Sequence, residues 1–312
     1  MNDNVIVTEN LTKFYGKLKA LDNLTINVKR GITGFLGPNA AGKTTTIKIL
    51  MGLLTPSSGK AFVLGINPTE EPIKVRKKVG FLPENPRPYK NMKGSEFLDF
   101  IAKLRGVPAK QRKEEISDLL EQVGLAERAE DRISSYSRGM IQRLFIAQTL
   151  IGDPELILLD EPTAGLDPLG REDIINLLRE LSKSGKSIFI SSHILSEVER
   201  VCRHVLIIDR GQLILEGDVE KIKEEFASGR YKVKSDKPEM LLKELLGKSY
   251  IKDAWIEDNA IMVIPTDDKE FRKRVLEISV SLGCEVFSLE KELPSLQNIF
   301  VSLIKKRGGK IR

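Results

Sequence analysis

The chain has 312 residues, of which 30% are charged and 41% are hydrophobic. This balance is typical of globular proteins and excludes a disordered or collagen-like chain. Because no run of eighteen consecutive apolar residues occurs, the sequence predicts no membrane-spanning helix. At roughly 150 residues per domain, the length favours two domains.

The beginning of the chain, MNDNVIVTEN, lacks the basic and apolar regions of a secretory signal, so we expect a cytosolic protein. The two cysteines, Cys202 and Cys284, have neither the spacing of a zinc site nor the density of a disulfide framework. We expect both to be buried or neutral thiols.

The net charge of +6 is concentrated at one end of the chain. Residues 305–312, KKRGGKIR, hold five positive charges and no negative one. The rest of the chain is nearly neutral, so no nucleic-acid partner is expected. The basic tail is either a solvated terminus or a segment attracted to an anionic membrane surface.

Short apolar runs alternate with helical patterns through the first two thirds of the chain. Strands are predicted over residues 5–9, 24–29, 32–36, 156–159, 187–190 and 205–208. Helices are predicted after the Gly-rich turn that follows residue 36 and over residues 95–105, 108–123 and 169–182. The helices over residues 95–105 and 108–123 indicate a helical insert. The later strands fit buried parallel strands with crossover helices.

The pattern changes near Phe226, where FASGR interrupts it. From Tyr231 the predicted order is strand, helix, strand, strand, helix, strand, followed by a last helix. After the first strand these elements cover residues 238–246, 250–256, 261–265, 267–282, 285–289 and 296–306. The order βαββαβ favours a small ferredoxin-like α+β domain. We therefore expect two domains, residues 1–225 and 226–312.

The segment GPNAAGKT, residues 37–44, matches G-x-x-x-x-G-K-[ST] between a predicted strand and a predicted helix. In this context the backbone N–H groups of the loop and the positive end of the helix surround a phosphate. Lys43 reaches the β- and γ-phosphates, and the Thr44 hydroxyl is a ligand for Mg²⁺. The alternative interpretation is a Gly-rich turn with a solvated lysine.

Two adjacent carboxylates, Asp160 and Glu161, follow the predicted strand LILL. Asp160 can hold Mg²⁺ directly or through water, and Glu161 can orient and deprotonate an attacking water. Two acids at a buried strand end are costly without a cation, whereas at a solvated strand end they are ordinary. Together with the loop, the pair favours a nucleoside triphosphatase.

With these motifs, residues 1 to about 225 resemble the ATP-binding cassette (ABC) family, the nucleotide-hydrolysing subunits of ABC transporters. Residues 37–45 resemble its Walker A motif and residues 156–162 its Walker B motif. Residues 135–143, SYSRGMIQR, resemble its signature motif. The family's D-loop, switch histidine and adenine-stacking aromatic are matched by Asp167, His193 and Tyr15. The closest resemblance is to drug-resistance and polysaccharide exporters, whose subunits also carry a small C-terminal domain and a segment like LPSLQNIF.

The resemblance implies a P-loop NTPase cassette of the α/β class, with a parallel sheet core, a small antiparallel β subdomain and the helical insert, before the ferredoxin-like domain. It implies ATP and Mg²⁺ as cofactors. Nucleotide contacts are expected from Tyr15, Gly37, Pro38, Asn39, Ala40, Ala41, Gly42, Lys43, Thr44, Thr45, Ser137, Gly139 and Asp167. Catalytic roles are expected for Glu161, His193 and Glu84, and metal contacts for Thr44, Asp160 and Glu84.

Three departures from the family pattern qualify these expectations. Ala40 stands where the family usually has glycine, and its Cβ crowds the backbone if the residue has a positive φ. Glu84 replaces the usual Q-loop glutamine; it cannot donate the hydrogen bonds of an amide but can still approach Mg²⁺ or its water. In the signature, Tyr136, Arg138 and Met140 replace the commoner Leu, Gly and Gln.

The resemblance also implies a second ATP-binding subunit, identical or different, with each nucleotide held between Walker A of one subunit and Ser137 and Gly139 of the other. ATP binding closes this dimer and hydrolysis reopens it, which would drive transport through a separate membrane-spanning subunit. Export is the expected direction, and the cytoplasmic face of the membrane is the expected location.

The sequence bears on two rival functions. A soluble ABC ATPase acting on translation or DNA would carry a second cassette or a long coiled-coil insert, and the sequence has neither. An ATP-sensing regulatory protein with little turnover, whose C-terminal domain binds a ligand, remains open. Stimulation of ATPase activity by a membrane partner would separate that protein from a transporter subunit.

Overall fold

The computed structural model describes residues 3–183, 185–227 and 229–306, without the side chains of residues 305 and 306. The basic tail therefore lies outside the described side chains. The chain divides into two compact units, Met1–Val219 and Glu220–Arg312, and each is considered by itself. This division falls slightly earlier in the chain than the boundary expected at residue 225, and the independence of the two domains stays a prediction.

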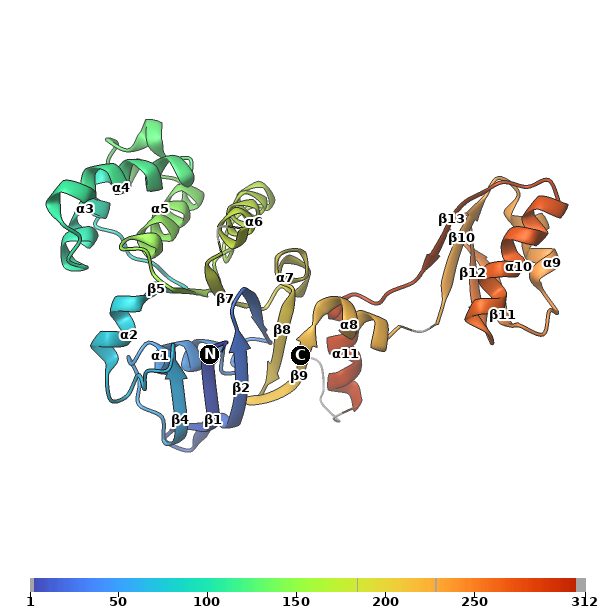
Figure 1. The fold of residues 1–312 in the computed structure, drawn as a ribbon, viewed down its shortest axis with the longest axis horizontal. Helices are drawn as coiled ribbons and strands as arrows, with labels where there is room; N and C mark the ends of the chain where they lie inside the picture. Colours follow the sequence, from blue (N-terminus) through green and yellow to red (C-terminus); the bar gives the residue numbers. More distant parts are fainter. Residues whose placement is uncertain (1–2, 184, 228, 307–312) are drawn as a thin grey trace. The chain divides into compact units, whose positions relative to one another are not determined.

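A six-stranded sheet with the order β5-β6-β7-β3-β8-β9 forms the centre of the first unit (Figure 1). Its strands are β3 (Ile32–Leu36), β5 (Val79–Leu82), β6 (Leu156–Asp160), β7 (Ser187–Ser192), β8 (His204–Asp209) and β9 (Gln212–Asp218). Five of them are parallel, and β9 pairs antiparallel with β8. Every residue of β3, β6 and β7 is buried, which explains their continuous apolar runs.

A second sheet of the same unit is antiparallel, with the order β2-β1-β4. It consists of β1 (Asn4–Tyr15), β2 (Leu18–Lys29) and β4 (Ser58–Val63). Both predicted strands of this sheet are confirmed but extend further, and β4 was not predicted because SGKAFV has only one face of buried residues. Its apolar residues share one core with α1 (Lys43–Leu50) and the central sheet.

The helices of the first unit include the two predicted for the insert, which begin at Gly94 and Ala109. The helices of this unit are α1, α2 (Pro72–Lys78), α3 (Gly94–Leu104), α4 (Ala109–Gln122), α5 (Arg138–Leu150), α6 (Pro168–Lys183) and α7 (Leu195–Val201). Figure 1 shows α3, α4 and α5 as one group, apart from the antiparallel sheet. Among the described residues, no helix has the length and apolar character needed to cross a bilayer.

The second unit has the predicted βαββαβ order. It contains β10 (Tyr231–Ser235), α9 (Pro238–Leu245), β11 (Ile251–Glu257), β12 (Ala260–Pro265), α10 (Asp268–Ser281) and β13 (Val286–Lys291). The strands form an antiparallel sheet with the order β11-β12-β10-β13. Residues of α9 and α10 share a core with the sheet. In this core the ring centroids of Tyr231 and Phe271 are 5.1 Å apart. The helices α8 (Val219–Glu225) and α11 (Leu296–Lys306) precede and follow this fold.

Candidate functional site

Three segments that carry predicted site residues meet at one edge of the central sheet. β3 and β6 both pair with β7, so that Leu36 lies opposite Ser192 and Asp160 lies opposite Ser191. The Gly37 N–H donates to the carbonyl of Ser192 at 3.3 Å. The phosphate-loop candidate, the acidic pair and the histidine loop therefore start from neighbouring positions, because parallel strands end at the same edge.

The loop of residues 37–42 has little room for larger side chains. An ideal Cβ on Gly37 would lie 2.4 Å from the carbonyl oxygen of Ile208. At Gly42, where φ is 108°, it would lie 2.6 Å from Leu21 Cδ2. Ala40 has a φ of 62°, the left-handed conformation that its side chain disfavours by about 1 kcal/mol. The condition under which the Cβ of Ala40 crowds the backbone, a positive φ, is therefore met.

Lys43 begins α1 and turns its side chain back over the loop. Its side chain is only 6% exposed, and Nζ donates to the carbonyls of Gly37 at 2.8 Å and Pro38 at 3.2 Å. Nζ also lies 3.2 Å from Oε1 of Glu161. A buried ammonium with these acceptors is a fixed positive charge, not a solvated lysine.

Asp160 is held by a hydroxyl from the neighbouring strand. The Ser191 Oγ donates to Asp160 Oδ1 at 2.5 Å, and both residues are almost completely buried. Burial raises the pKa of the Asp160 carboxyl, and hydrogen bonds from Ser191 and from Thr44 at the start of α1 offset part of that effect. The Asp160 carboxylate and the Thr44 hydroxyl therefore lie close together, and both have oxygen atoms that can be metal ligands.

Glu161 is fixed in an unusual backbone conformation, with a φ of 51°. Its N–H donates to Ser191, to Oγ at 3.1 Å and to the carbonyl at 3.2 Å. Its Oε2 lies 2.8 Å from Nδ1 of His193, whose backbone N–H also donates to it at 3.3 Å. The Glu161 side chain is 8% exposed, whereas the His193 side chain is 43% exposed. A buried carboxylate oriented by a histidine has the geometry of a base held in place by a second group.

The remaining predicted residues lie outside this cluster. Tyr15 ends β1 with 46% of its surface exposed and has Lys13 Nζ 5.6 Å from its ring centre. Glu84 is exposed after β5, and among the described residues no hydrogen bond joins it to Thr44 or Asp160. Asp167 precedes α6, where its Oδ1 accepts from the Gly170 N–H at 2.8 Å.

Ser137 and Gly139 lie at the N-terminus of α5. The Ser137 Oγ accepts from the Met140 N–H at 3.3 Å and caps the helix. A Cβ on Gly139 would have no neighbour closer than 4.0 Å, so the backbone at this point is open. The roles of these residues toward a nucleotide remain proposals.

The unusual tyrosine of the signature segment is accommodated by a glycine. Tyr136 is 7% exposed, and its hydroxyl donates to the carbonyl of Arg128 at 2.6 Å. An ideal Cβ on Gly94 would lie 2.4 Å from that hydroxyl oxygen. The departure at Tyr136 is therefore a packing feature of the helical insert.

Sequence reasoning missed the structural role of Ser191, which contacts both acidic residues. The only available signal was its place in the segment SSH before His193, and a serine in a buried strand is usually read as a packing residue. The contact between Arg138 and Gly165 was also missed, because Gly165 belongs to a distant segment of the chain.

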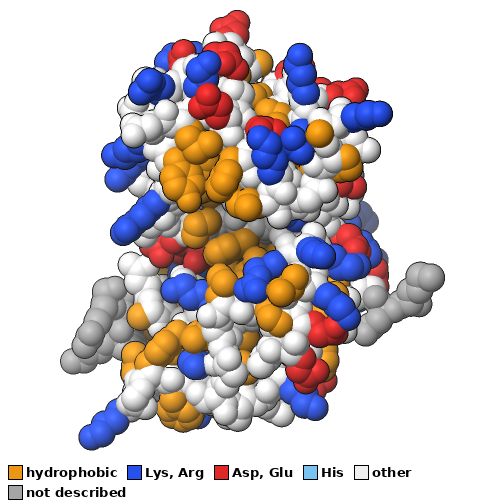
Figure 2. All heavy atoms as spheres, turned by 90° about the vertical axis from the view of Figure 1, so that its left-hand side faces the viewer, with side chains coloured by type: hydrophobic (Ala, Val, Ile, Leu, Met, Phe, Trp, Pro, Cys, Tyr) orange, Lys and Arg blue, Asp and Glu red, His pale blue; other side chains and the backbone are white. Residues whose placement is uncertain are grey.

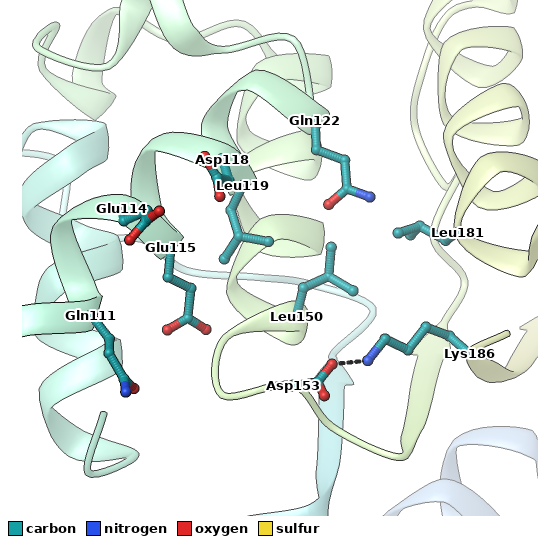
Figure 3. A pocket seen from close by; sticks show the side chains of 10 residues that line it. All are labelled: Gln111, Glu114, Glu115, Asp118, Leu119, Gln122, Leu150, Asp153, Leu181 and Lys186. Atoms are coloured by element: carbon teal, nitrogen blue, oxygen red, sulfur yellow. Dashed lines mark hydrogen bonds and ion pairs between the residues drawn. The ribbon is translucent and has the colours of Figure 1, made fainter. Parts of the chain in front are cut away.

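A separate cavity lies between α4, the end of α5 and α6 (Figure 3). Its lining includes Glu114, Glu115 and Asp118 on α4 and an ion pair between Asp153 and Lys186. None of the residues predicted to contact a nucleotide lines it. Its acidic lining makes it unsuitable for a triphosphate.

Comparisons with known proteins agree with this geometry. Residues 21–164 match the family model described as ABC transporter. The chain is 36% identical over 314 residues to the uncharacterized ABC transporter ATP-binding protein all4389 of Nostoc sp., with 97% of this chain and 91% of that relative covered. The chain belongs to the family of ABC transporter ATP-binding proteins.

Two further members of the family extend the comparison. The bacitracin transport ATP-binding protein BcrA of Bacillus licheniformis is 44% identical over 221 residues, covering 70% of this chain and 71% of BcrA. The structure of cbiO1 from Clostridium perfringens, part of the ABC transporter complex cbiONQ, matches with a TM-score of 0.66 at 28% identity. That match covers 72% of this chain and 92% of cbiO1.

Proposed function

We propose that the chain binds ATP with Mg²⁺ and hydrolyses it, as one of two ATP-binding subunits that drive a membrane-spanning transporter subunit. The observation that carries this proposal is the meeting of Lys43, Asp160 and Glu161 at one edge of the sheet. The names of BcrA and cbiO1, an ATP-binding protein and a transporter component, support it.

The phosphates of ATP are proposed to lie over the loop of residues 37–45. Lys43 supplies the cation, and the N-terminus of α1 adds the positive end of its dipole. The adenine is proposed to stack on Tyr15, whose ring is exposed at the end of β1.

The oxygen donors of Asp160 and Thr44 fit a magnesium ion. Mg²⁺ binds proteins through one or two carboxylate or hydroxyl oxygens and completes its shell with water and phosphate oxygens. Burial raises the pKa of Asp160, so a nearby cation would favour the ionised carboxylate that coordination needs. When bound, the ion would neutralise charge on the phosphates. Glu84 is proposed to approach the ion or its water from the segment after β5.

Glu161 is proposed to be the base that takes the proton from the attacking water. His193 holds one carboxylate oxygen at 2.8 Å and so limits the orientations of the side chain. Because the carboxylate is buried, it is shielded from bulk water, which strengthens its interaction with a reacting group.

The second ATP-binding subunit is proposed to face the N-terminus of α5. Ser137 is exposed, and the backbone at Gly139 has open space beside it. A contact to a γ-phosphate across an interface requires this accessibility. Asp167 is proposed to lie at the same interface.

The membrane-spanning partner is proposed to bind the face shared by α2 and α3. Figure 2 shows hydrophobic side chains gathered on this face. Exposed apolar residues of these segments are Ile73 on α2, Tyr89 before α3 and Leu104 at the end of α3, each more than half exposed. Large exposed apolar groups of this kind mark interaction surfaces. This partner would place the chain at the cytoplasmic face of a membrane, and the resemblance to drug-resistance subunits favours export.

A second candidate function is an ABC-type ATPase with a regulatory or sensing role. The separate core of the second unit favours it, because such a unit can bind a ligand without contributing to the nucleotide site. A rise in ATPase rate on addition of the membrane partner supports the transporter function, whereas a rise on addition of a small ligand supports the sensor.

The decisive experiment compares the wild type with Glu161→Gln and Lys43→Ala. Glu161→Gln should bind ATP, lose nearly all phosphate release and accumulate as an ATP-bound dimer on size exclusion, because the amide keeps the shape but takes no proton. Lys43→Ala should lose ATP binding. Full turnover by Glu161→Gln would exclude Glu161 as the base, and unchanged affinity in Lys43→Ala would exclude Lys43 as the cation that binds the phosphates.

A further inference from the structure

Arg138 connects the start of α5 to the loop that follows the acidic pair. Its Nη1 donates to the carbonyl of Gly165 at 2.9 Å. Gly165 has a φ of 72°, and an ideal Cβ there would lie 2.7 Å from that same nitrogen, so the close approach depends on glycine. Arg138 stands where the signature pattern usually has glycine, which has no side chain to make such a bond.

The loop of residues 164–167 is also held from the opposite side. The Arg171 Nε of α6 donates to the carbonyl of Leu166 at 3.0 Å. Glu197 of α7 lies 3.5 Å from Arg171 Nη1 and accepts a hydrogen bond from Thr163. Two consecutive carbonyls of the loop are therefore bound by arginines from two different helices, α5 and α6.

This loop is continuous with the proposed base. The Ala164 N–H donates to the carbonyl of Glu161 at 3.1 Å, which closes a turn immediately before Gly165. Glu161 has a φ of 51°, a conformation that persists only where neighbouring contacts hold it. A displacement of Gly165 would therefore be transmitted to the backbone of Glu161 through one turn.

We propose that Arg138 is a positioning residue for hydrolysis, which links the nucleotide bound across the dimer interface to Glu161 of the same chain. The inference rests on the proposed function, in which Ser137 and Gly139, on either side of Arg138, contact that nucleotide. Contact fixes the N-terminus of α5, and the guanidinium then fixes Gly165 and the turn at Glu161. Without the bond, the turn samples more conformations and Glu161 spends less time in the reactive one.

Among the described residues, Arg138 has no hydrogen bond to the loop of residues 37–45, so its loss should spare nucleotide binding. The test compares full-length wild type, Arg138→Gln and Arg138→Lys. Arg179→Gln is the matched control, because Arg179 also binds a backbone carbonyl, that of Arg200, through Nε and Nη2. For each protein, the affinity for a fluorescent ATP analogue, the melting temperature, kcat and the Hill coefficient for ATP are measured.

We expect Arg138→Gln to lower kcat about 2- to 30-fold, the factor that corresponds to the usual coupling energies between two sites. Its Hill coefficient should fall toward 1, while affinity and melting temperature match those of the wild type. Arg138→Lys should recover part of kcat because it keeps a cationic donor, and Arg179→Gln should equal the wild type.

Three outcomes would overturn the inference. Wild-type kcat and Hill coefficient in Arg138→Gln would show that the bond has no role in hydrolysis. A parallel loss of ATP affinity or melting temperature would make Arg138 a structural residue. A wild type that binds ATP without hydrolysing it would refute the proposed function itself, and the inference with it.

Discussion

Replacing Ser191 by alanine removes a hydroxyl that contacts both acidic residues of the site. Its hydrogen bond to Asp160 Oδ1, at 2.5 Å, joins a buried donor to a carboxylate, and such bonds contribute about 1.5–3 kcal/mol. The Glu161 N–H loses Oγ as an acceptor but keeps the Ser191 carbonyl at 3.2 Å, so its share of the loss is small. We therefore expect Ser191→Ala to lower the free energy of unfolding by about 2–3 kcal/mol.

Ser187 is the matched control for this substitution. It lies on the same strand, β7, is 1% exposed, and its Oγ has no hydrogen-bond partner among the described residues. Ser187→Ala should leave stability unchanged or raise it, because it removes a buried polar group without a partner. Urea unfolding of the three proteins measures both effects. Equal stability of Ser191→Ala and Ser187→Ala would refute the reasoning.

Asp160→Asn should be more stable than the wild type at neutral pH and equal to it in acid. Burial raises the folded-state pKa of Asp160, so the wild type loses stability as the pH rises through and above the ordinary carboxyl range. The amide of the variant does not titrate and therefore causes no such loss. Urea unfolding of both proteins from pH 3 to 7 measures the difference. Ala40→Gly should keep or increase ATP affinity and change stability by less than about 1 kcal/mol, because glycine relieves the strained φ but gains unfolded-state entropy. A large loss of affinity for a fluorescent ATP analogue would show that the methyl group is a required contact. Tyr136→Phe should cost about 1 kcal/mol in thermal unfolding, for the lost bond to Arg128, and an unchanged melting temperature would contradict that value.

Strands and helices with a strong periodic pattern were predictable from the sequence. β3 and the later helix α11 have the predicted bounds, and the helices of the insert differ from prediction by only one or two residues at their ends. The βαββαβ order of the second unit was also predictable, because its alternating strands and amphipathic helices each bury one face. In contrast, β4, β5 and β9 were not predicted. The residues of β4 and β9 are mostly exposed or partly exposed and carry little apolar signal, and β5 has only four residues.

The sequence alone predicted the chemistry of the candidate site. A lysine in a Gly-rich loop before a helix and two acids after a buried strand have few uses other than phosphate and metal binding, so Lys43, Asp160 and Glu161 were found from local pattern. The expected crowding at Ala40 was stated as a condition on φ, and only the folded loop supplied its value of 62°.

The contacts that hold these groups were decided only by the tertiary structure. Ser191 meets Asp160, and Arg138 meets Gly165, through pairings between segments that lie about thirty residues apart in the chain. Such contacts depend on strand register and on the packing of α5 against its neighbours, and neither leaves a periodic trace in the sequence. Local pattern therefore determined which residues are proposed to carry the chemistry, whereas their orientation follows from long-range packing.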